Sequence, residues 1–148
     1  MAREKIELKI HDLEAADRFG AIRELMQGLA AESGMNATEA RRIEEEILER
    51  ERLTSTAIGN GLAIPHARVA AVDRVRAVLG RSVQGIEWET PDGQPVHLVF
   101  QFISPKIGIQ IHTEMLAKIA RLAHEQEFNH VTIRNLESND LWELLDNH

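Results

Sequence analysis

The chain has 148 residues, of which 43% are hydrophobic and 28% are charged, and it contains no cysteine. Disulfides, thiol catalysis and zinc–thiolate sites are therefore excluded, and the formal net charge of −7 argues against general nucleic-acid binding. No linker-like tract divides the sequence, so we expect a single domain over residues 1–148.

The N-terminal segment predicts a strand followed by a helix. Residues 6–10 alternate between apolar and polar side chains, which is typical of a short strand and not of a signal peptide or membrane span. We therefore expect the protein in the cytosol. Asp17 is a suitable N-cap for a helix that ends at Gly34. The apolar residues of this helix recur at helical spacing: Ile22, Leu25, Met26, Leu29 and Ala30.

A second helix is expected from Asn36 or Thr38 through about Arg52, with a polar outer face. Its inward residues are Ile43, Ile47 and Leu48. Beyond it, residues 54–56 and 59–61 carry turn signals, and the short apolar run 62–64 stops at Pro65. Because proline has a fixed φ and no N–H, we expect a strand to end there and His66 to point out of the sheet.

The second half of the chain predicts a hairpin and then helices. Strands are expected over residues 75–83 and 96–103, joined by a turn at 91–93, followed by a loop over 104–108. A helix is expected over 109–125 and a short one over 140–145, whereas 128–136 is ambiguous between helix and strand. Strands and helices mix without strict βαβ alternation, which favours a mixed sheet covered by helices.

Among seven histidines, His66 has the best local setting for nucleophilic chemistry. An ordinary imidazole is about three quarters neutral at pH 7 and is then a nucleophile. The small residues Gly59, Gly61, Ala63 and Ala67 near His66 allow a backbone or a bulky phosphate to approach closely. From these local features alone, a histidine that merely ends a strand is an equally good interpretation.

His112, Arg50 and Thr56 are weaker candidates. A neutral His112 near the start of the predicted helix 109–125 could donate a hydrogen bond to a phosphoryl oxygen, but it could equally be a boundary histidine bonded to backbone. Arg50 offers a planar fork of donors suited to phosphate, and Arg52 and Arg68 compete for that role. The hydroxyl of Thr56 or Ser55 could add a donor, although hydroxyls in turns often bond their own backbone. His66 and His112 lack a third metal ligand at a suggestive spacing.

The stretch from Arg50 to Ala67, with Ile-Gly-Asn-Gly before Leu-Ala-Ile-Pro-His, resembles the phosphorylation-site signature of fructose/mannitol-type IIA domains. These domains belong to the bacterial phosphoenolpyruvate-dependent phosphotransferase system and include the nitrogen-type regulatory IIA proteins. Residues 92–100 and the segment 112–120 resemble two further family segments, so the similarity covers nearly the whole chain. The apolar loop 106–111 departs from the family pattern and could be a docking surface.

The resemblance implies a three-layer α/β/α sandwich with a mixed sheet, the phosphotransferase/anion-transport-protein-like fold. It implies that His66 carries the phosphoryl group, that His112 supports it and that Arg50 binds its charge. Thr56 is a further expected phosphoryl-binding residue. The implied donor is the phosphocarrier HPr and the implied acceptor a IIB domain, with no metal or cofactor required.

Two other functions remain open from the sequence. A nitrogen-type regulatory protein would use the same phosphohistidine as a switch that controls binding to target proteins. An inert paralogue would keep the fold alone, but the presence of His66, His112 and Arg50 argues against it.

Overall fold

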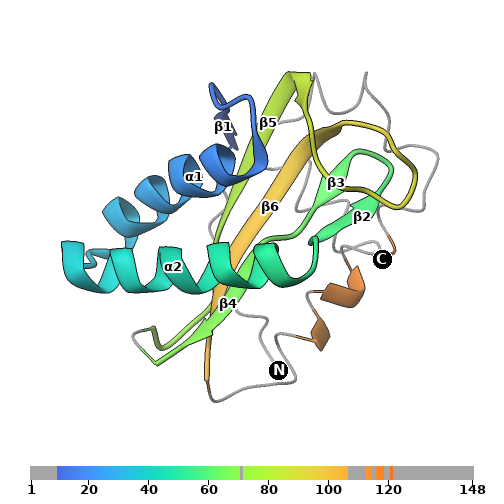
Figure 1. Cartoon of the computed structure of the whole chain (residues 1–148). Helices are drawn as coiled ribbons and strands as arrows, with labels where there is room; N and C mark the ends of the chain where they lie inside the picture. Colours follow the sequence, from blue (N-terminus) through green and yellow to red (C-terminus); the bar gives the residue numbers. More distant parts are fainter. Residues whose placement is uncertain (1–9, 71, 107–112, 115, 119–120, 122–148) are drawn as a thin grey trace.

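The computed structural model describes residues 10–70, 72–106, 113–114, 116–118 and 121 of the chain. The described part is a six-stranded sheet with two long helices, α1 and α2, against one face (Figure 1). Among the described residues, no helix is long and apolar enough to cross a membrane. The predicted α/β class with a mixed sheet is confirmed. The segments predicted over 128–136 and 140–145 lie outside the described residues, so the predicted third layer is not described.

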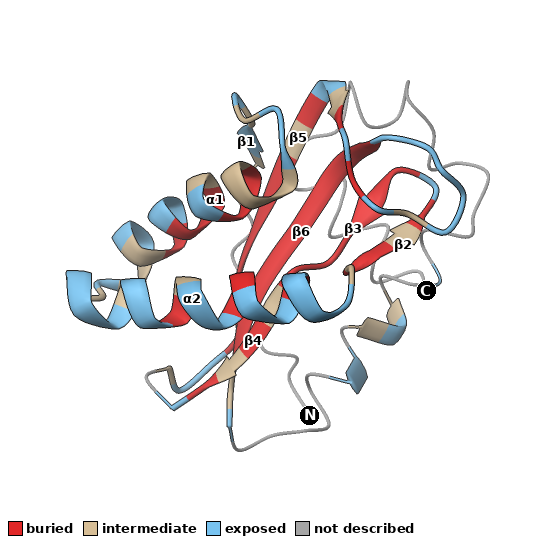
Figure 2. Ribbon diagram, in the orientation of Figure 1, coloured by how far each residue is buried: buried red, intermediate tan, exposed pale blue. Residues whose placement is uncertain are grey.

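The two helices begin and end where their capping residues predict. α1 spans Arg18–Ser33, with the Asp17 side chain accepting from the Gly20 N–H and Gly34 ending the helix in the left-handed conformation. α2 spans Ala37–Leu53, and its N-cap is Asn36. Of the apolar residues predicted to face inward, Ala30 is half-buried and the others, Ile22 and Ile47 among them, are buried (Figure 2). Both helix predictions are thus confirmed.

The sheet runs in the order β1-β5-β6-β3-β2, with β4 also paired to β6. The strands are β1 (Ile10–Asp12), β2 (Ala57–Gly59), β3 (Leu62–Ala63), β4 (His66–Val69), β5 (Arg76–Ile86) and β6 (Val96–Pro105). β5 and β6 are antiparallel, as the hairpin prediction requires, whereas β1 pairs with β5, and β3 and β4 with β6, in parallel. The sheet is therefore mixed.

Two strand predictions need correction. β3 ends at Ala63, but His66 begins a new strand, β4, that pairs with the far end of β6. Pro65 separates β3 from β4 along β6, because it has no N–H to donate. Its carbonyl still accepts from the Phe102 N–H of β6. The predicted loop at 104–108 is also wrong at its start, since β6 continues through Pro105.

The core that positions the site lies between the sheet and the two helices. Ala67 and Val69 of β4 belong to the same buried cluster as Ile22, Ile47 and Leu48 of the helices. Because side chains alternate along a strand, His66 and Arg68 project from the other face of β4. The helices are close to the sheet at Gly80, where an added Cβ would lie 2.9 Å from Leu25.

Candidate functional site

The His66 ring is held by contacts from two directions. Its Nδ1 lies 2.7 Å from the Ile64 carbonyl oxygen, and the ring stacks on Phe102, with centroids 5.2 Å apart and planes 12° from parallel. Since a carbonyl oxygen can only accept, Nδ1 carries the proton and donates it. The lone pair of the neutral ring is then on Nε2. Nε2 is therefore the basic nitrogen of the neutral ring.

His66 is neutral more readily than an ordinary histidine. Burial is the main cause that lowers the pKa of His66, and the nearby Arg50 charge lowers it further. The hydrogen bond to Ile64 and the charge of Glu51 act in the opposite direction on this pKa, and the net effect is a lowered value. The ring is half-buried and not sealed in the core, so it combines a favourable charge state with access from solvent.

Arg50 is an exposed residue in the last turn of α2. Its positive charge lowers the pKa of His66. Its two competitors for the phosphate-binding role already have partners. Arg52 forms an ion pair with Glu49 at 3.2 Å, and Arg68 donates to the Lys106 carbonyl. Of the three arginines, Arg50 is therefore the best-placed candidate.

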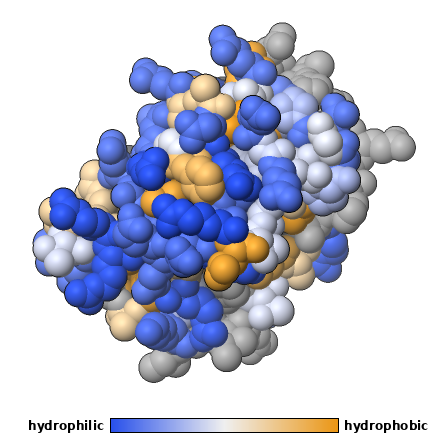
Figure 3. All heavy atoms as spheres, viewed as in Figure 1, coloured by the Kyte–Doolittle hydropathy of each residue, from blue (hydrophilic) through white to orange (hydrophobic). Residues whose placement is uncertain are grey.

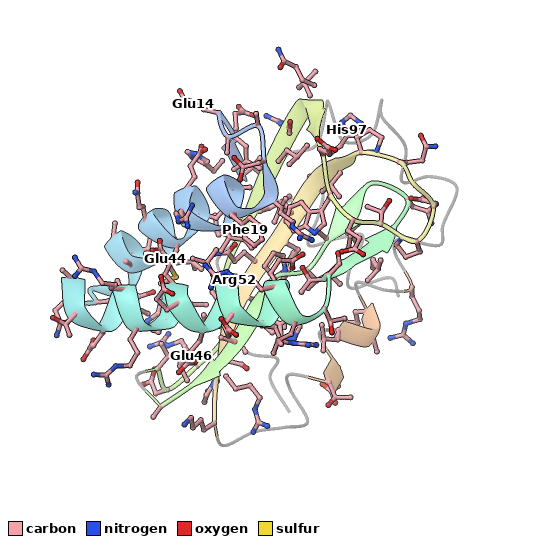
Figure 4. All side chains as sticks on the ribbon, viewed as in Figure 1. Glu14, Phe19, Glu44, Glu46, Arg52 and His97 are labelled. Atoms are coloured by element: carbon pink, nitrogen blue, oxygen red, sulfur yellow. The ribbon has the colours of Figure 1, made fainter. Side chains whose placement is uncertain are left out.

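The junction of α1 and α2 fixes the helix end that carries Arg50. The Phe19 ring contacts two guanidinium groups, that of Arg18 at 4.8 Å and that of Arg52 at 5.9 Å from the ring centroid; Figure 4 labels Phe19 and Arg52. The face over α1 and α2 is otherwise mostly hydrophilic, with small separate apolar patches (Figure 3). Leu53, which ends α2, is an apolar residue on this face and is 74% exposed.

The Thr56 hydroxyl, predicted to donate a hydrogen bond to a phosphoryl oxygen, already has a partner. Thr56 is buried, and its hydroxyl donates to Glu51 at 2.6 Å. Its backbone N–H donates to the same carboxylate at 3.0 Å. Because the hydroxyl has one proton, it would have to change partner to bind a phosphoryl oxygen. The phosphoryl-binding role of Thr56 stays a prediction, and in this structure its hydroxyl donates to Glu51.

The Gly59-Asn60-Gly61 turn connects β2 to β3 and is hydrogen-bonded to Asp92 and to the start of β6. The Asn60 N–H donates to the Asp92 carboxylate at 2.9 Å, and Asn60 has a positive φ of 54°. The Gly61 carbonyl accepts from the N–H groups of His97 and Leu98. The small residues thus allow close backbone approach, as predicted. A carboxylate beside this turn makes it unsuitable as a cradle for phosphate.

His112 lies outside the described residues, as does the predicted docking loop except for Lys106. Helical structure is present at residues 113–114, 116–118 and 121, in agreement with the helix predicted over 109–125. Within the described residues, no group of three or more His, Asp or Glu side chains is placed to hold a metal ion.

Two residues at the site were missed by the sequence analysis. Phe102 has no local signal, because its stacking on His66 depends on the pairing of β4 with β6. Glu51 did have a signal. It follows Ile47 by four residues and Leu48 by three, which puts a carboxylate on the apolar stripe of α2. It is indeed buried, with 1% of its surface exposed.

Comparisons with known proteins place this chain in one family. Residues 4–148 match the family described as phosphoenolpyruvate-dependent sugar phosphotransferase system, EIIA 2. The nitrogen regulatory protein of Bradyrhizobium diazoefficiens is 36% identical over 78% of this chain and 73% of its own length. The fructose-specific EIIABC component of Bacillus subtilis is 31% identical over 93% of this chain, which spans only 21% of that relative's length.

Solved structures agree with the fold. Nitrogen regulatory protein IIA-Ntr from Neisseria meningitidis has a TM-score of 0.79 and 25% identity, covering 93% of this chain and 92% of its own. Enzyme IIAMtl of Escherichia coli, solved in complex with phosphorylated IIBMtl, has a TM-score of 0.67 and 21% identity, with 95% of both chains covered, and shares the fold. The chain belongs to the EIIA 2 family of the phosphoenolpyruvate-dependent sugar phosphotransferase system.

Proposed function

We propose that this chain is a cytoplasmic phosphocarrier in which His66 accepts a phosphoryl group from phospho-HPr and transfers it to a IIB domain. The observation that carries the proposal is the Nδ1–H hydrogen bond from His66 to the Ile64 carbonyl. It presents a neutral imidazole with its lone pair on Nε2, near Arg50. We take residues 1–148 as one functional domain.

The transfer step follows from this arrangement. Nε2 of neutral His66 forms a bond to phosphorus in line while the P–N bond of the donor imidazole breaks, and the donor nitrogen keeps the electron pair. The phosphorylated His66 ring gains a positive charge, and the Ile64 carbonyl stabilises it by accepting from Nδ1–H. Arg50 and His112 stabilise the charge on the equatorial phosphoryl oxygens. The return step to the acceptor reverses these changes.

Reconstitution tests the proposal directly. The chain is incubated with phosphoenolpyruvate, enzyme I and HPr, and the labelled residue is mapped by mass spectrometry under alkaline conditions that preserve phosphohistidine. We expect one phosphoryl group on His66, attached at Nε2. Labelling at another residue, or none, would contradict the proposal.

A regulatory function is the second candidate, and the similarity to nitrogen regulatory proteins favours it. In that case phosphorylation of His66 adds negative charge at an interface and changes the affinity for a target protein. Genome context separates the two functions, because a sugar permease operon favours transport and a nitrogen sigma-factor region favours regulation. Transfer of the phosphoryl group to a IIB domain in vitro would support the first.

A further inference from the structure

Glu51 is a buried carboxylate that the transfer step does not use. It directly follows Arg50 in the last turn of α2, where it is one of the few buried positions on an exposed helix (Figure 2). Burying a charged group costs free energy unless donors compensate for the lost water. The position therefore needs a structural or functional reason.

Hydrogen-bond donors from three segments surround the Glu51 carboxylate. Trp88 Nε1–H lies 2.7 Å from Oε1, and Arg18 approaches the same oxygen at 3.5 Å. Oε2 accepts from both the N–H and the hydroxyl of Thr56. These donors compensate for the water that the buried Glu51 side chain has lost. Glu51 thus joins α1, the turn after α2 and the segment around Trp88.

A continuous series of hydrogen bonds leads from Glu51 to the His66 ring. The Glu51 carboxylate accepts from the N–H and the hydroxyl of Thr56. The Thr56 carbonyl accepts from the Ile64 N–H at 3.0 Å. The Ile64 carbonyl in turn accepts from His66 Nδ1–H at 2.7 Å. The last of these bonds selects the tautomer with its lone pair on Nε2. The first also fixes the helix turn from which Arg50 projects.

We propose that Glu51 is the positioning residue of this site: through Thr56 and Ile64 it fixes the orientation and tautomer of His66, and through the last turn of α2 it fixes Arg50. The proposal rests on the proposed function, and it adds a residue that touches neither phosphorus nor the donor protein.

The charge of Glu51 gives the proposal a second observable. Among charged groups of the described residues, Arg50 lowers the pKa of His66 and Glu51 raises it, although burial has the largest effect. Arg18 from α1 faces Glu51 and Glu89, and Arg68 on β4 binds the Lys106 carbonyl. Two consecutive residues of α2, Arg50 and Glu51, therefore shift the pKa of His66 in opposite directions.

The test compares Glu51→Gln with Glu49→Gln, a matched change at an exposed glutamate two residues earlier in α2. ¹⁵N-detected NMR measures the His66 tautomer and pKa in the unphosphorylated protein, and the reconstituted system measures the phosphorylation rate. For Glu51→Gln we expect a lower pKa of His66, loss of the single Nδ1–H tautomer and phosphorylation slower by about 10- to 100-fold. Glu49→Gln should match the wild type, and Arg50→Gln should raise the pKa of His66.

Each outcome has a defined meaning. A Glu51→Gln protein with the wild-type tautomer, pKa and rate overturns the proposal. If the wild type is not phosphorylated on His66 but its tautomer still depends on Glu51, the proposed function fails and the positioning role survives.

If Glu51→Gln does not fold, Thr56→Val carries the test, because it removes one donor to the carboxylate and keeps the side-chain shape. Thr56→Ser keeps the hydroxyl and serves as its control. We expect Thr56→Val to weaken the tautomer preference and slow phosphorylation, and Thr56→Ser to restore both. A wild-type tautomer and rate in Thr56→Val would overturn the proposal.

Discussion

His66 and His97 have similar hydrogen bonds and very different surroundings. In both, Nδ1 lies close to a backbone carbonyl oxygen, Ile64 at 2.7 Å and Ser82 at 2.9 Å. His97 is 7% exposed near the start of β6, whereas His66 is half-buried on β4, which pairs with the opposite end of β6 (Figures 1 and 4). The Arg50 charge lowers the pKa of His66. The His97 ring instead lies against Gly85, where an added Cβ would be 3.0 Å from the ring.

The difference shows that a fixed tautomer does not by itself make a nucleophile. Both rings have Nδ1 close to a backbone carbonyl oxygen, but His66 is the more exposed of the two and its pKa is lowered by the Arg50 charge. At His97 the same hydrogen bond stabilises a packed strand.

The largest expected effect separates the two histidines by activity. His66→Ala should abolish phosphorylation by the phosphoenolpyruvate, enzyme I and HPr system, because the attacking atom is removed. His97→Gln should retain it. Mass spectrometry of the intact protein measures both, and a stable phosphohistidine on the His66 variant would contradict the assignment.

Removing the charge beside His66 should have the next largest effect. We expect Arg50→Ala to slow phosphoryl transfer by about 10²–10³-fold, the loss typical of one preorganised donor to a transition-state charge. Arg52→Ala is the control, since Arg52 is exposed and pairs with Glu49. Single-turnover kinetics with phospho-HPr measures the loss. Equal rates in the two variants would remove Arg50 from the site.

Stability should rank the two histidines in the reverse order. His97→Ala leaves the Ser82 carbonyl without this donor and opens space beside Gly85, so we expect it to cost about 1–3 kcal/mol of unfolding free energy. His66→Ala should cost less, because its ring is at an accessible edge. Urea unfolding followed by circular dichroism compares them, and a larger loss for His66 would reverse the comparison.

His112 should contribute a smaller effect than Arg50. His112→Ala should fold and transfer the phosphoryl group about tenfold more slowly, which corresponds to one neutral hydrogen bond of about 1.4 kcal/mol. Rates of phosphorylation from phospho-HPr and of transfer to a IIB domain provide the readout. Unchanged rates in both directions would exclude His112 from the site.

The smallest effect is a displaced pH profile. The nucleophile is the neutral ring, so the rate falls as pH drops through the pKa of His66. Because burial and Arg50 lower that pKa below the ordinary value, activity should persist to a more acidic pH than an unperturbed histidine would allow. A pH–rate profile of phosphorylation, with HPr phosphorylated in advance, tests the direction. An acid limb above pH 6.5 would contradict it.

Much of the fold and part of the site could be predicted from the sequence because the signals are local. Asp17, Asn36 and Gly34 bracket the helices through side-chain and backbone preferences that act within a few residues. His66 was identified from its immediate neighbours and a family signature. The strand boundary at His66 was not predicted, since pairing with β6 decides it.

What only the tertiary structure decided is the environment that gives those residues their chemistry. Phe102 stacks on His66 across a strand pair. Trp88 donates a hydrogen bond to Glu51, although the two residues are 37 positions apart in the sequence. Local sequence determined which residues are present, which helices form and where they end. The orientation, charge state and accessibility of one imidazole depend on contacts between distant segments, because burial and electrostatics act through space and not along the chain.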